Sequence, residues 1–529
     1  MSDQSNNHHL VHWADFTADR IIRQLGDKES YTLASGITPS GVVHFGNFRE
    51  VITVDFVARA LRARGKKVRF IFSWDDYDTF RKIPKNMPNQ EKLENFMFQP
   101  IVDTPDPYED KASYAEYHEK SFENQLDKVG IVMTPLYQAT KYRSGEYAKG
   151  IRKAIESTKE IKDILNQYRK EPLSDDWLPV SVYCSKCNTD HKIVNKKWDG
   201  ESVSYDCENC GNQGKEVLSE TSRLKLPWRI DWPMRWAYEK VDFEPGGKDH
   251  SSQGGSFSTA KEIVNLFDWK APIYLQYDFV SIKGGGGKMS SSSGDVVTVN
   301  DVLRVYEPEM VRWIFASYKS NVDFAVSFDL DVIKTYEDFD RQERLAYGLE
   351  KGNEKKVNMA KRVYELSQIT EKPESMPFQP SFRHLTNVLQ IHDRNITKAR
   401  EYYQSEISNE RDERRFQQRA SCALFWLENY APEDFKFAIN SETPKVELDD
   451  KKRSYISDVV EGLKAKTFDS DETLNDFLYE VMHNYELKPN DVFPLCYGIL
   501  INKQKGPKLA GFMNTIGLEK VKNLLSGAL

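Results

Sequence analysis

The chain has 529 residues, of which 39% are hydrophobic and 12% are aromatic. This length and composition exclude a single small domain and a globally disordered protein, and they predict several folded domains. The 74 Lys and Arg residues are outnumbered by 81 Asp and Glu, which gives a formal net charge of -7. A nucleic acid must therefore be held by local basic surfaces, because no positive field covers the whole protein.

The sequence offers no membrane segment. It has no window of roughly 18 uninterrupted apolar residues, and residues 1–16 lack the basic and apolar regions of a signal peptide. We therefore expect a cytoplasmic protein without a membrane partner. The sequence leaves the oligomeric state open, and we expect a monomer.

The first regular pattern spans residues 31 to 74. Residues 32–37 predict a buried strand, residues 47–64 carry apolar side chains at helical spacing, and residues 66–74 predict a second strand. Strand, helix and strand in this order form a βαβ unit, whose ligands lie beyond the carboxyl ends of parallel strands. The pattern indicates an α/β protein with a Rossmann-like parallel sheet.

Residues 38–47, TPSGVVHFGN, connect the first strand to the helix. The N–H groups and the dipole at a helix start attract anions, and Gly46 lets a phosphate approach the backbone. His44 and Asn47 are then placed to donate hydrogen bonds to phosphate oxygens during phosphoryl or nucleotidyl transfer. A helix cap with an incidental histidine explains the same residues equally well.

A second segment, residues 283–294, reads KGGGGKMSSSSG. Its glycine run predicts a loop that can move. Lys288 at the tip would bring an ammonium group to a polyphosphate, and the serine hydroxyls would add donors. By composition alone, a flexible linker with a solvated lysine is the simpler interpretation.

Four of the six cysteines form two Cys-x-x-Cys pairs, Cys184 with Cys187 and Cys207 with Cys210. Residues 188–206 separate the pairs, which is within the usual zinc-ribbon gap of about 15 to 20 residues. Four thiolates complete a tetrahedral zinc shell, so the pattern predicts a structural and not a catalytic Zn²⁺. Disulfides would require an oxidising compartment that nothing else in the sequence supports.

Residues 227–236 and 246–255 are unusually rich in Trp, Arg and Gly. This composition suits a pocket wall, and Asp249, after a glycine turn, suits the acceptance of hydrogen bonds from two ribose hydroxyls. A buried aromatic cluster with a capping aspartate explains the same residues. Asp75, Asp76 and Asp78 follow the second strand as further carboxylates, either for a substrate or as a solvated or magnesium-binding cluster.

Together these segments resemble the class I lysyl-tRNA synthetases of archaea and some bacteria, relatives of glutamyl-tRNA synthetase, along essentially the whole chain. Residues 44–47 resemble the HIGH signature, residues 288–292 resemble the KMSKS signature, and WRIDWPMRW and GGKDH carry the rest of the likeness. Two positions depart from the class pattern. Asn47 replaces the second histidine and Ser291 replaces the second lysine, so Lys288 would act without a companion.

The resemblance implies a set of site residues. Its catalytic residues are His44, Asn47 and Lys288, and Asp249 holds the ATP ribose. The implied ATP site consists of His44, Gly46, Asn47, Asp249, Lys288, Met289 and Ser290. The implied lysine pocket consists of Gly36, Thr38, Trp228, His250 and Tyr277. The implied zinc ligands are the four clustered cysteines.

The resemblance also implies the activity and the domain order. ATP and Mg²⁺ would activate lysine as lysyl-adenylate, and tRNA(Lys) would then receive the lysyl group. We expect a catalytic sheet in two halves (1–111 and 227–294), a zinc-ribbon insertion (112–226), a stem-contact helical connection (295–380) and an all-α anticodon-binding domain (381–529).

Three other interpretations remain open from the residues alone. The nearest is another class I synthetase of the glutamyl type, because spacing does not distinguish lysine from another amino acid. A small-molecule nucleotidyltransferase could share the His-x-Gly phosphate device, but it would leave the large helical C-terminal region unexplained. A non-catalytic zinc-ribbon protein that binds RNA would show no lysine-dependent turnover of ATP.

Overall fold

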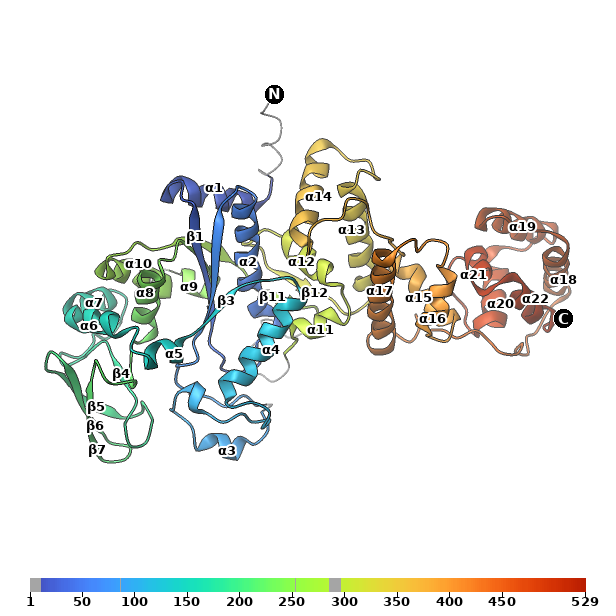
Figure 1. Cartoon of the computed structure of the whole chain (residues 1–529). Helices are drawn as coiled ribbons and strands as arrows, with labels where there is room; N and C mark the ends of the chain where they lie inside the picture. The colour runs from blue at the N-terminus through green and yellow to red at the C-terminus, as the bar shows by residue number, and fades with distance from the viewer. Residues whose placement is uncertain (1–10, 86, 253, 285–295) are drawn as a thin grey trace, which may run out of the picture. The chain divides into compact units, whose positions relative to one another are not determined.

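The computed structural model describes residues 11–85, 87–252, 254–284 and 296–529 (Figure 1). The chain divides into two compact units. The first unit comprises Met1–Leu303, Pro308–Ser327 and Gln342–Lys372. The second unit comprises Arg304–Glu307, Phe328–Arg341 and Pro373–Leu529.

A five-stranded sheet forms the centre of the first unit, with the strand order β10-β9-β1-β2-β3. All of its neighbouring strands run parallel. The order reverses at β1, which lies between β2 and β9, so the expected ligand site is at the carboxyl end of β1. This topology confirms the Rossmann-like sheet. The strands are β1 (Ser30–Ile37), β2 (Lys67–Trp74), β3 (Thr134–Tyr137), β9 (Phe243–Gly247) and β10 (Ile273–Tyr277).

The helix α2 (Phe45–Arg62) connects β1 to β2. The predicted bounds of these three elements all lie within two residues of the observed ones. The helix forms because its apolar side chains recur at helical spacing and are removed from water together. The apolar positions that predicted it are all fully buried: Val51, Val54, Val57, Ala58 and Leu61.

The helix α8 (Trp228–Glu239) packs on the sheet. Its Trp232 and Trp236 form one apolar cluster with Ala34 of β1 and Ile71 of β2. The segment WRIDWPMRW is therefore helical, and tryptophans four residues apart share the face that meets the sheet. The other helices of at least eight residues that lie wholly in this unit are α1 (Trp13–Leu25), α4 (Tyr114–Lys128), α6 (Ala148–Glu156), α7 (Thr158–Asn166), α10 (Ser256–Ile263), α12 (Pro308–Ser317) and α14 (Glu354–Ser367).

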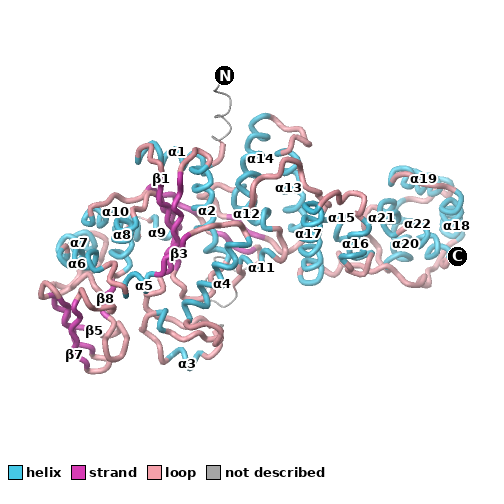
Figure 2. The backbone as a smooth tube through the Cα atoms, viewed as in Figure 1, coloured by secondary structure: helices cyan, strands magenta, loops and turns pink. Residues whose placement is uncertain are grey.

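Between β3 and α8 the chain leaves the sheet. Because β3 pairs with β2 but lies inside the range expected for the insertion, 112–226, the departing segment begins only after Tyr137. The segment contains a two-stranded and a three-stranded antiparallel sheet (Figure 2). Their strands are β4 (Ser181–Val182) with β8 (Leu224–Lys225), and β5 (Ile193–Trp198), β6 (Ser202–Cys207) and β7 (Asn212–Val217).

Regular structure in residues 373–529, all of which are described, is helical only. The core of this part contains Leu478, Leu500, Met513 and Leu525, one from each of four helices. No helix in the described part of the chain is long and apolar enough to cross a membrane. The helices are α15 (Phe382–Ile391), α16 (Ile396–Tyr402), α17 (Glu410–Asn429), α18 (Asp450–Ala465), α19 (Asp471–Asn484), α20 (Pro489–Ile501), α21 (Leu509–Ile516) and α22 (Leu518–Ser526). The helix α13 (Asp331–Ala346) belongs partly to each unit.

Candidate active site

A cavity of about 460 Å³ opens at the carboxyl ends of β1, β9 and β10. We call it the active-site cavity. Lys288, Met289 and Ser290 lie outside the described residues. Every other residue that the sequence assigns to the ATP site or the amino-acid pocket lines it: Gly36, Thr38, His44, Gly46, Asn47, Trp228, Asp249, His250 and Tyr277. Segments separated by up to about 240 residues in the sequence thus meet at the reversal point of the sheet.

The start of α2 forms one wall of the cavity, and His44 is its N-cap. The Asn47 backbone N–H donates to His44 Nδ1 at 3.3 Å, and the His44 backbone N–H donates to Asn47 Oδ1 at 3.1 Å. Because Nδ1 accepts a hydrogen bond, the neutral imidazole carries its proton on Nε2. This wall therefore offers a ring N–H, the Asn47 amide and the helix dipole to an anion.

The described chain resumes at residue 296 and contacts the same wall. The Phe45 backbone N–H donates to the Val297 carbonyl at 2.7 Å. Val297 follows Lys288 by nine residues. Val297 is therefore held at the first turn of α2, beside His44.

Aromatic side chains also line the cavity, among them Trp228 and His250. Trp228 and Trp232 stack with 5.0 Å between ring centroids and 14° between planes, and His250 lies 6.4 Å from Trp228. The guanidinium of Arg235 lies 5.6 Å from the Trp228 ring centroid. Such stacked rings present flat apolar faces and can interact favourably with a cation.

Each of the three aspartates after β2 contacts a residue of another segment. Asp75 pairs with Arg235 at 2.7 Å, Asp76 accepts from the Ala139 backbone N–H at 2.7 Å, and Asp78 accepts from the Thr38 hydroxyl at 3.1 Å. Burial raises the pKa of Asp75 to about 6 and that of Asp76 to about 7. These contacts give the three carboxylates a structural role that the sequence analysis did not consider.

Sequence reasoning missed two carboxylates at this site. Glu50 of α2 lines the active-site cavity, and both Glu50 and Glu244 of β9 line a smaller cavity that adjoins it. A signal existed for Glu50, because it follows Asn47 by three residues and so shares its helix face. No comparable signal existed for Glu244, since its position depends on which strand neighbours β1.

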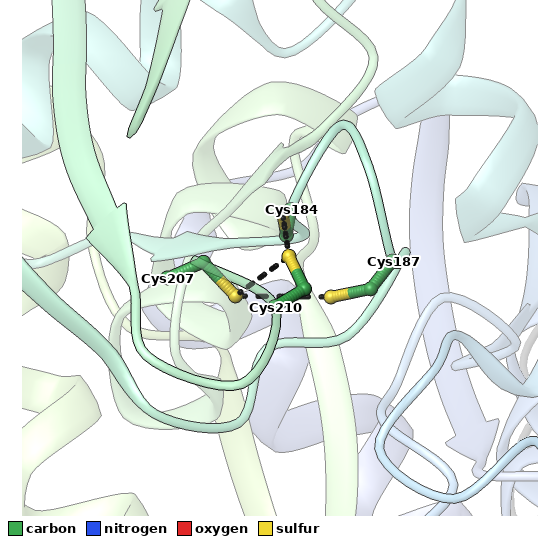
Figure 3. A group of neighbouring side chains, drawn as sticks. All are labelled: Cys184, Cys187, Cys207 and Cys210. Carbon is green, nitrogen blue, oxygen red and sulfur yellow. Dashed lines mark hydrogen bonds between the residues drawn. The ribbon is translucent and has the colours of Figure 1, made fainter. Parts of the chain in front are cut away.

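The four clustered cysteines meet in the insertion (Figure 3). Their sulfur atoms all lie within 4.8 Å of one another, and three of the pairs are 3.6 to 3.7 Å apart. A tetrahedral zinc site with Zn–S bonds of about 2.3 Å has S···S edges of about 3.8 Å. The cluster therefore has the ligand type, number and spacing that Zn²⁺ requires.

Residues 11–370 match the family described as "tRNA synthetases class I (K)". The chain belongs to this family. It is 48% identical over 519 residues to a lysine–tRNA ligase of Borreliella burgdorferi, with 98% of this chain and 99% of the relative covered. It is 44% identical to one of Treponema pallidum, with 98% of each chain covered, and 42% identical to one of Thermococcus kodakarensis, with 97% and 98% covered.

The class I synthetase family has a Rossmann-type catalytic sheet, and the resemblance read from the motifs is confirmed. The match ends near the start of the all-helical part of the second unit, whereas the three relatives extend over it. The family match therefore covers most of the first unit of this class I synthetase. The similarity to the three relatives continues through the C-terminal helices.

Proposed function

We propose that this protein attaches L-lysine to tRNA(Lys) with ATP, through a lysyl-adenylate intermediate. The observation that carries the proposal is that all the described candidates for the ATP site and the amino-acid pocket meet around one cavity at the reversal point of the sheet. Relatives named lysine–tRNA ligase, alike over nearly the whole chain, support lysine as the amino acid.

The reaction consists of two substitutions. A carboxylate oxygen of lysine attacks the α-phosphorus of ATP, and the bond between that phosphorus and the bridging oxygen of the β-phosphate breaks. Pyrophosphate leaves with the electron pair. A terminal ribose hydroxyl of the tRNA then attacks the lysyl carbonyl, loses its proton and displaces AMP.

Placement and charge stabilisation supply most of the rate in such a reaction. We assign the phosphate contacts to His44 Nε2–H, the Asn47 amide and the first turn of α2, because these groups line one wall of the cavity. Lys288 adds an ammonium, and Val297, which follows it by nine residues, is held at Phe45. Asp249 binds the ribose hydroxyls. Mg²⁺ bound to the phosphates would neutralise the charge on pyrophosphate.

We assign Zn²⁺ to the four clustered cysteines, with a structural role. The loop that contains Cys184 and Cys187 contacts the segment that follows β2. The Tyr183 hydroxyl donates to the Tyr77 carbonyl at 2.9 Å, and the Thr79 hydroxyl donates to Asp190 at 2.7 Å. Bound metal would fix the loop between Tyr183 and Asp190, and so the position of the segment that carries Asp78.

The remaining assignments concern the tRNA and the other domains. We assign residues 295–380 to contact with the tRNA stem and residues 381–529 to the anticodon, where unpaired bases stack on aromatic rings. The protein works as a cytoplasmic monomer, and its partners are tRNA(Lys), lysine and ATP.

The decisive experiment is an amino-acid panel in ATP–pyrophosphate exchange. Lysine should be the best substrate by kcat/KM, and a preference for glutamate would favour the glutamyl alternative. Lys288→Ala should lower the exchange rate by several orders of magnitude with little loss of fold. Lys283→Ala, in the same glycine-rich segment, is the matched control and should keep the exchange rate. Near-normal exchange in the Lys288 variant would remove that loop from the mechanism.

A further inference from the structure

A short part of the active-site cavity lies outside the five-stranded sheet. The strand β10 ends at Tyr277, which pairs with Gly247 of β9, whereas Phe279 and Val280 line the same cavity beyond that end. We call residues 278–280 the outer wall segment. Because the hydrogen bonds of the large sheet stop before this segment, other contacts must fix its distance from the rest of the cavity.

Those contacts come from a later part of the first unit. The strand β11 (Val280–Ile282) begins in the outer wall segment and pairs in parallel with β12 (Phe324–Val326). The Asp278 backbone N–H donates to the Ser320 carbonyl at 3.0 Å. The outer wall segment is therefore held by the chain that runs from Ser320 into β12.

Arg49 of α2 binds the same chain. Its Nη2 donates to three backbone carbonyls, those of Lys319 at 2.9 Å, Ser320 at 2.7 Å and Val322 at 3.3 Å. The Ser320 carbonyl thus accepts from both Arg49 and Asp278, which its two lone pairs allow. Two successive hydrogen bonds therefore join α2 to the outer wall segment.

The guanidinium of Arg49 is enclosed. The residue is 2% exposed, and the ring centroids of Phe324 and Phe315 lie 4.9 and 5.9 Å from its Cζ. Burial lowers the pKa of Arg49 to about 10, and the charge of Asp278 acts in the opposite direction. Enclosing a charge is costly, and a well-packed apolar side chain often fills such a place at lower cost. The arginine is therefore better explained by the one geometry that its hydrogen bonds define than by packing.

Arg49 also lies close to the groups that we assign to the phosphates. It follows His44 by five residues and Asn47 by two. Since a helix rises about 1.5 Å per residue, Arg49 is about 7.5 Å along the axis from His44. A change in the contact between Arg49 and Ser320 would therefore change the distance between the phosphate-binding wall and the outer wall segment.

We propose that Arg49 is a positioning residue for ATP, which fixes the outer wall segment at the first turns of α2 and so sets the width of the active-site cavity. The inference rests on the proposed function, in which the phosphates lie at the start of α2. The rest of ATP would then extend along the lining that includes Phe279 and Val280. The amino-acid pocket depends less on Arg49, because Tyr277 is held inside the large sheet by its pairing with Gly247.

The test measures ATP–pyrophosphate exchange by the full chain, with ATP and lysine varied in turn. Arg49→Met keeps an unbranched side chain but removes every donor. Because a misplacement of about 1 Å can cost about 10²-fold in rate, kcat/KM for ATP should fall by about that factor. The KM for lysine should change much less. A general loss of structure would change the two substrates alike.

Arg49→Lys adds a readout that loss of packing would not give. The three acceptors meet at one nitrogen, and a lysine ammonium carries three donors on a side chain that is shorter by one bond. This variant should therefore recover part of the kcat/KM for ATP that Arg49→Met loses. Equal kinetics of the two variants, or equal rises in the KM values for ATP and lysine, would overturn the inference.

The matched control is Arg59→Met. Arg59 belongs to the same helix and donates to the Gln368 and Gly130 carbonyls at 2.6 and 3.2 Å, but it does not line the active-site cavity. This variant should lose stability without a selective change in kcat/KM for ATP. If Arg49→Met gives the same kinetics as the control, with a native circular-dichroism spectrum, the inference is wrong.

Two further outcomes have a defined meaning. If Arg49→Met does not fold, Arg49→Gln, which keeps two amide donors, is judged by the same criteria. Failure of the wild-type protein to use lysine would instead overturn the proposed function.

Discussion

The side chain of His44 caps α2 by accepting the Asn47 backbone N–H on Nδ1 at 3.3 Å. The same ring can therefore serve the helix through one nitrogen and a phosphate through the other. The two roles can be separated by substitution, because asparagine is among the best N-cap residues but has no group in the place of Nε2.

We predict that His44→Asn keeps the stability of the protein within about 0.5 kcal/mol, since the cap is retained. Its exchange rate should fall about 10²- to 10³-fold, the usual cost of losing one preorganised donor to transition-state charge. His44→Ala should lose a similar rate and about 1 kcal/mol of stability besides. Urea unfolding and steady-state exchange measure the two effects, and equal stability of both variants would contradict the capping role.

The central βαβ unit and the place of His44 at the start of α2 were predictable because both depend on local signals. Apolar spacing in residues 47–64 and the glycine-containing turn before it are read directly from the sequence. The cysteine cluster was predictable for the same reason, because the ligand spacing itself carries the information.

The carboxylate partners were not predictable, because they depend on tertiary neighbours. Asp75, Asp76 and Asp78 are adjacent in sequence, yet they meet Arg235, Ala139 and Thr38 respectively. These contacts depend on the order of the strands in the sheet, which no local sequence pattern indicates. The strand β3 was missed for a different reason: four residues with one proline carry little strand signal.

A second prediction concerns the pair formed by Lys225 and Asp78, whose lysine side chain is only 10% exposed. Asp78→Asn should destabilise the protein by about 3 kcal/mol, because it leaves an enclosed ammonium without its partner. The combined variant Asp78→Asn/Lys225→Met should recover much of that loss. A double-mutant cycle by chemical denaturation measures the coupling, and simple additivity of the two single changes would refute it.

Burial makes the stability of the first unit depend on pH through Glu119. Burial, followed by the charges of Asp76 and Glu123, raises the pKa of Glu119 to about 8. Because the folded state holds this proton more tightly than the unfolded chain, the free energy of unfolding should fall as pH rises from about 4.5 to 8, by about 1.4 kcal/mol per unit of pKa shift at most. Above pH 8 this contribution should be constant.

We predict that Glu119→Gln flattens this part of the pH profile and is more stable than the wild type at pH 8. Asp127→Asn removes an exposed carboxylate from the same helix, α4, and should leave the slope unchanged. Thermal unfolding at a series of pH values checks both. A slope in Glu119→Gln equal to that of the wild type would assign the pH dependence to other groups.

Zinc removal should affect more than the insertion. We predict one zinc per chain by elemental analysis, and its loss in Cys210→Ser together with a lower midpoint of thermal unfolding. Because Tyr183 and Asp190 contact the segment after β2, the KM for lysine should also rise in that variant. Cys422→Ser changes a buried cysteine outside the cluster and serves as the control. A zinc-free protein with unchanged stability would exclude a structural metal.

The last prediction concerns a cavity of about 600 Å³ within the second unit, which contains both basic and aromatic side chains. Tyr402, which is exposed, offers a ring face to unpaired bases, while Lys505 and Lys508 offer charge to phosphates. If this part of the chain binds the anticodon, Tyr402→Ala should weaken transition-state stabilisation for charging of tRNA(Lys), measured through kcat/KM, by about 1 to 3 kcal/mol. ATP–pyrophosphate exchange should not change. Lys508→Ala should in addition reduce the salt dependence of tRNA binding by about 0.7 in log–log slope, since one phosphate contact is lost. Equal loss of charging with a tRNA whose anticodon has been replaced would show that the cavity binds another part of the tRNA.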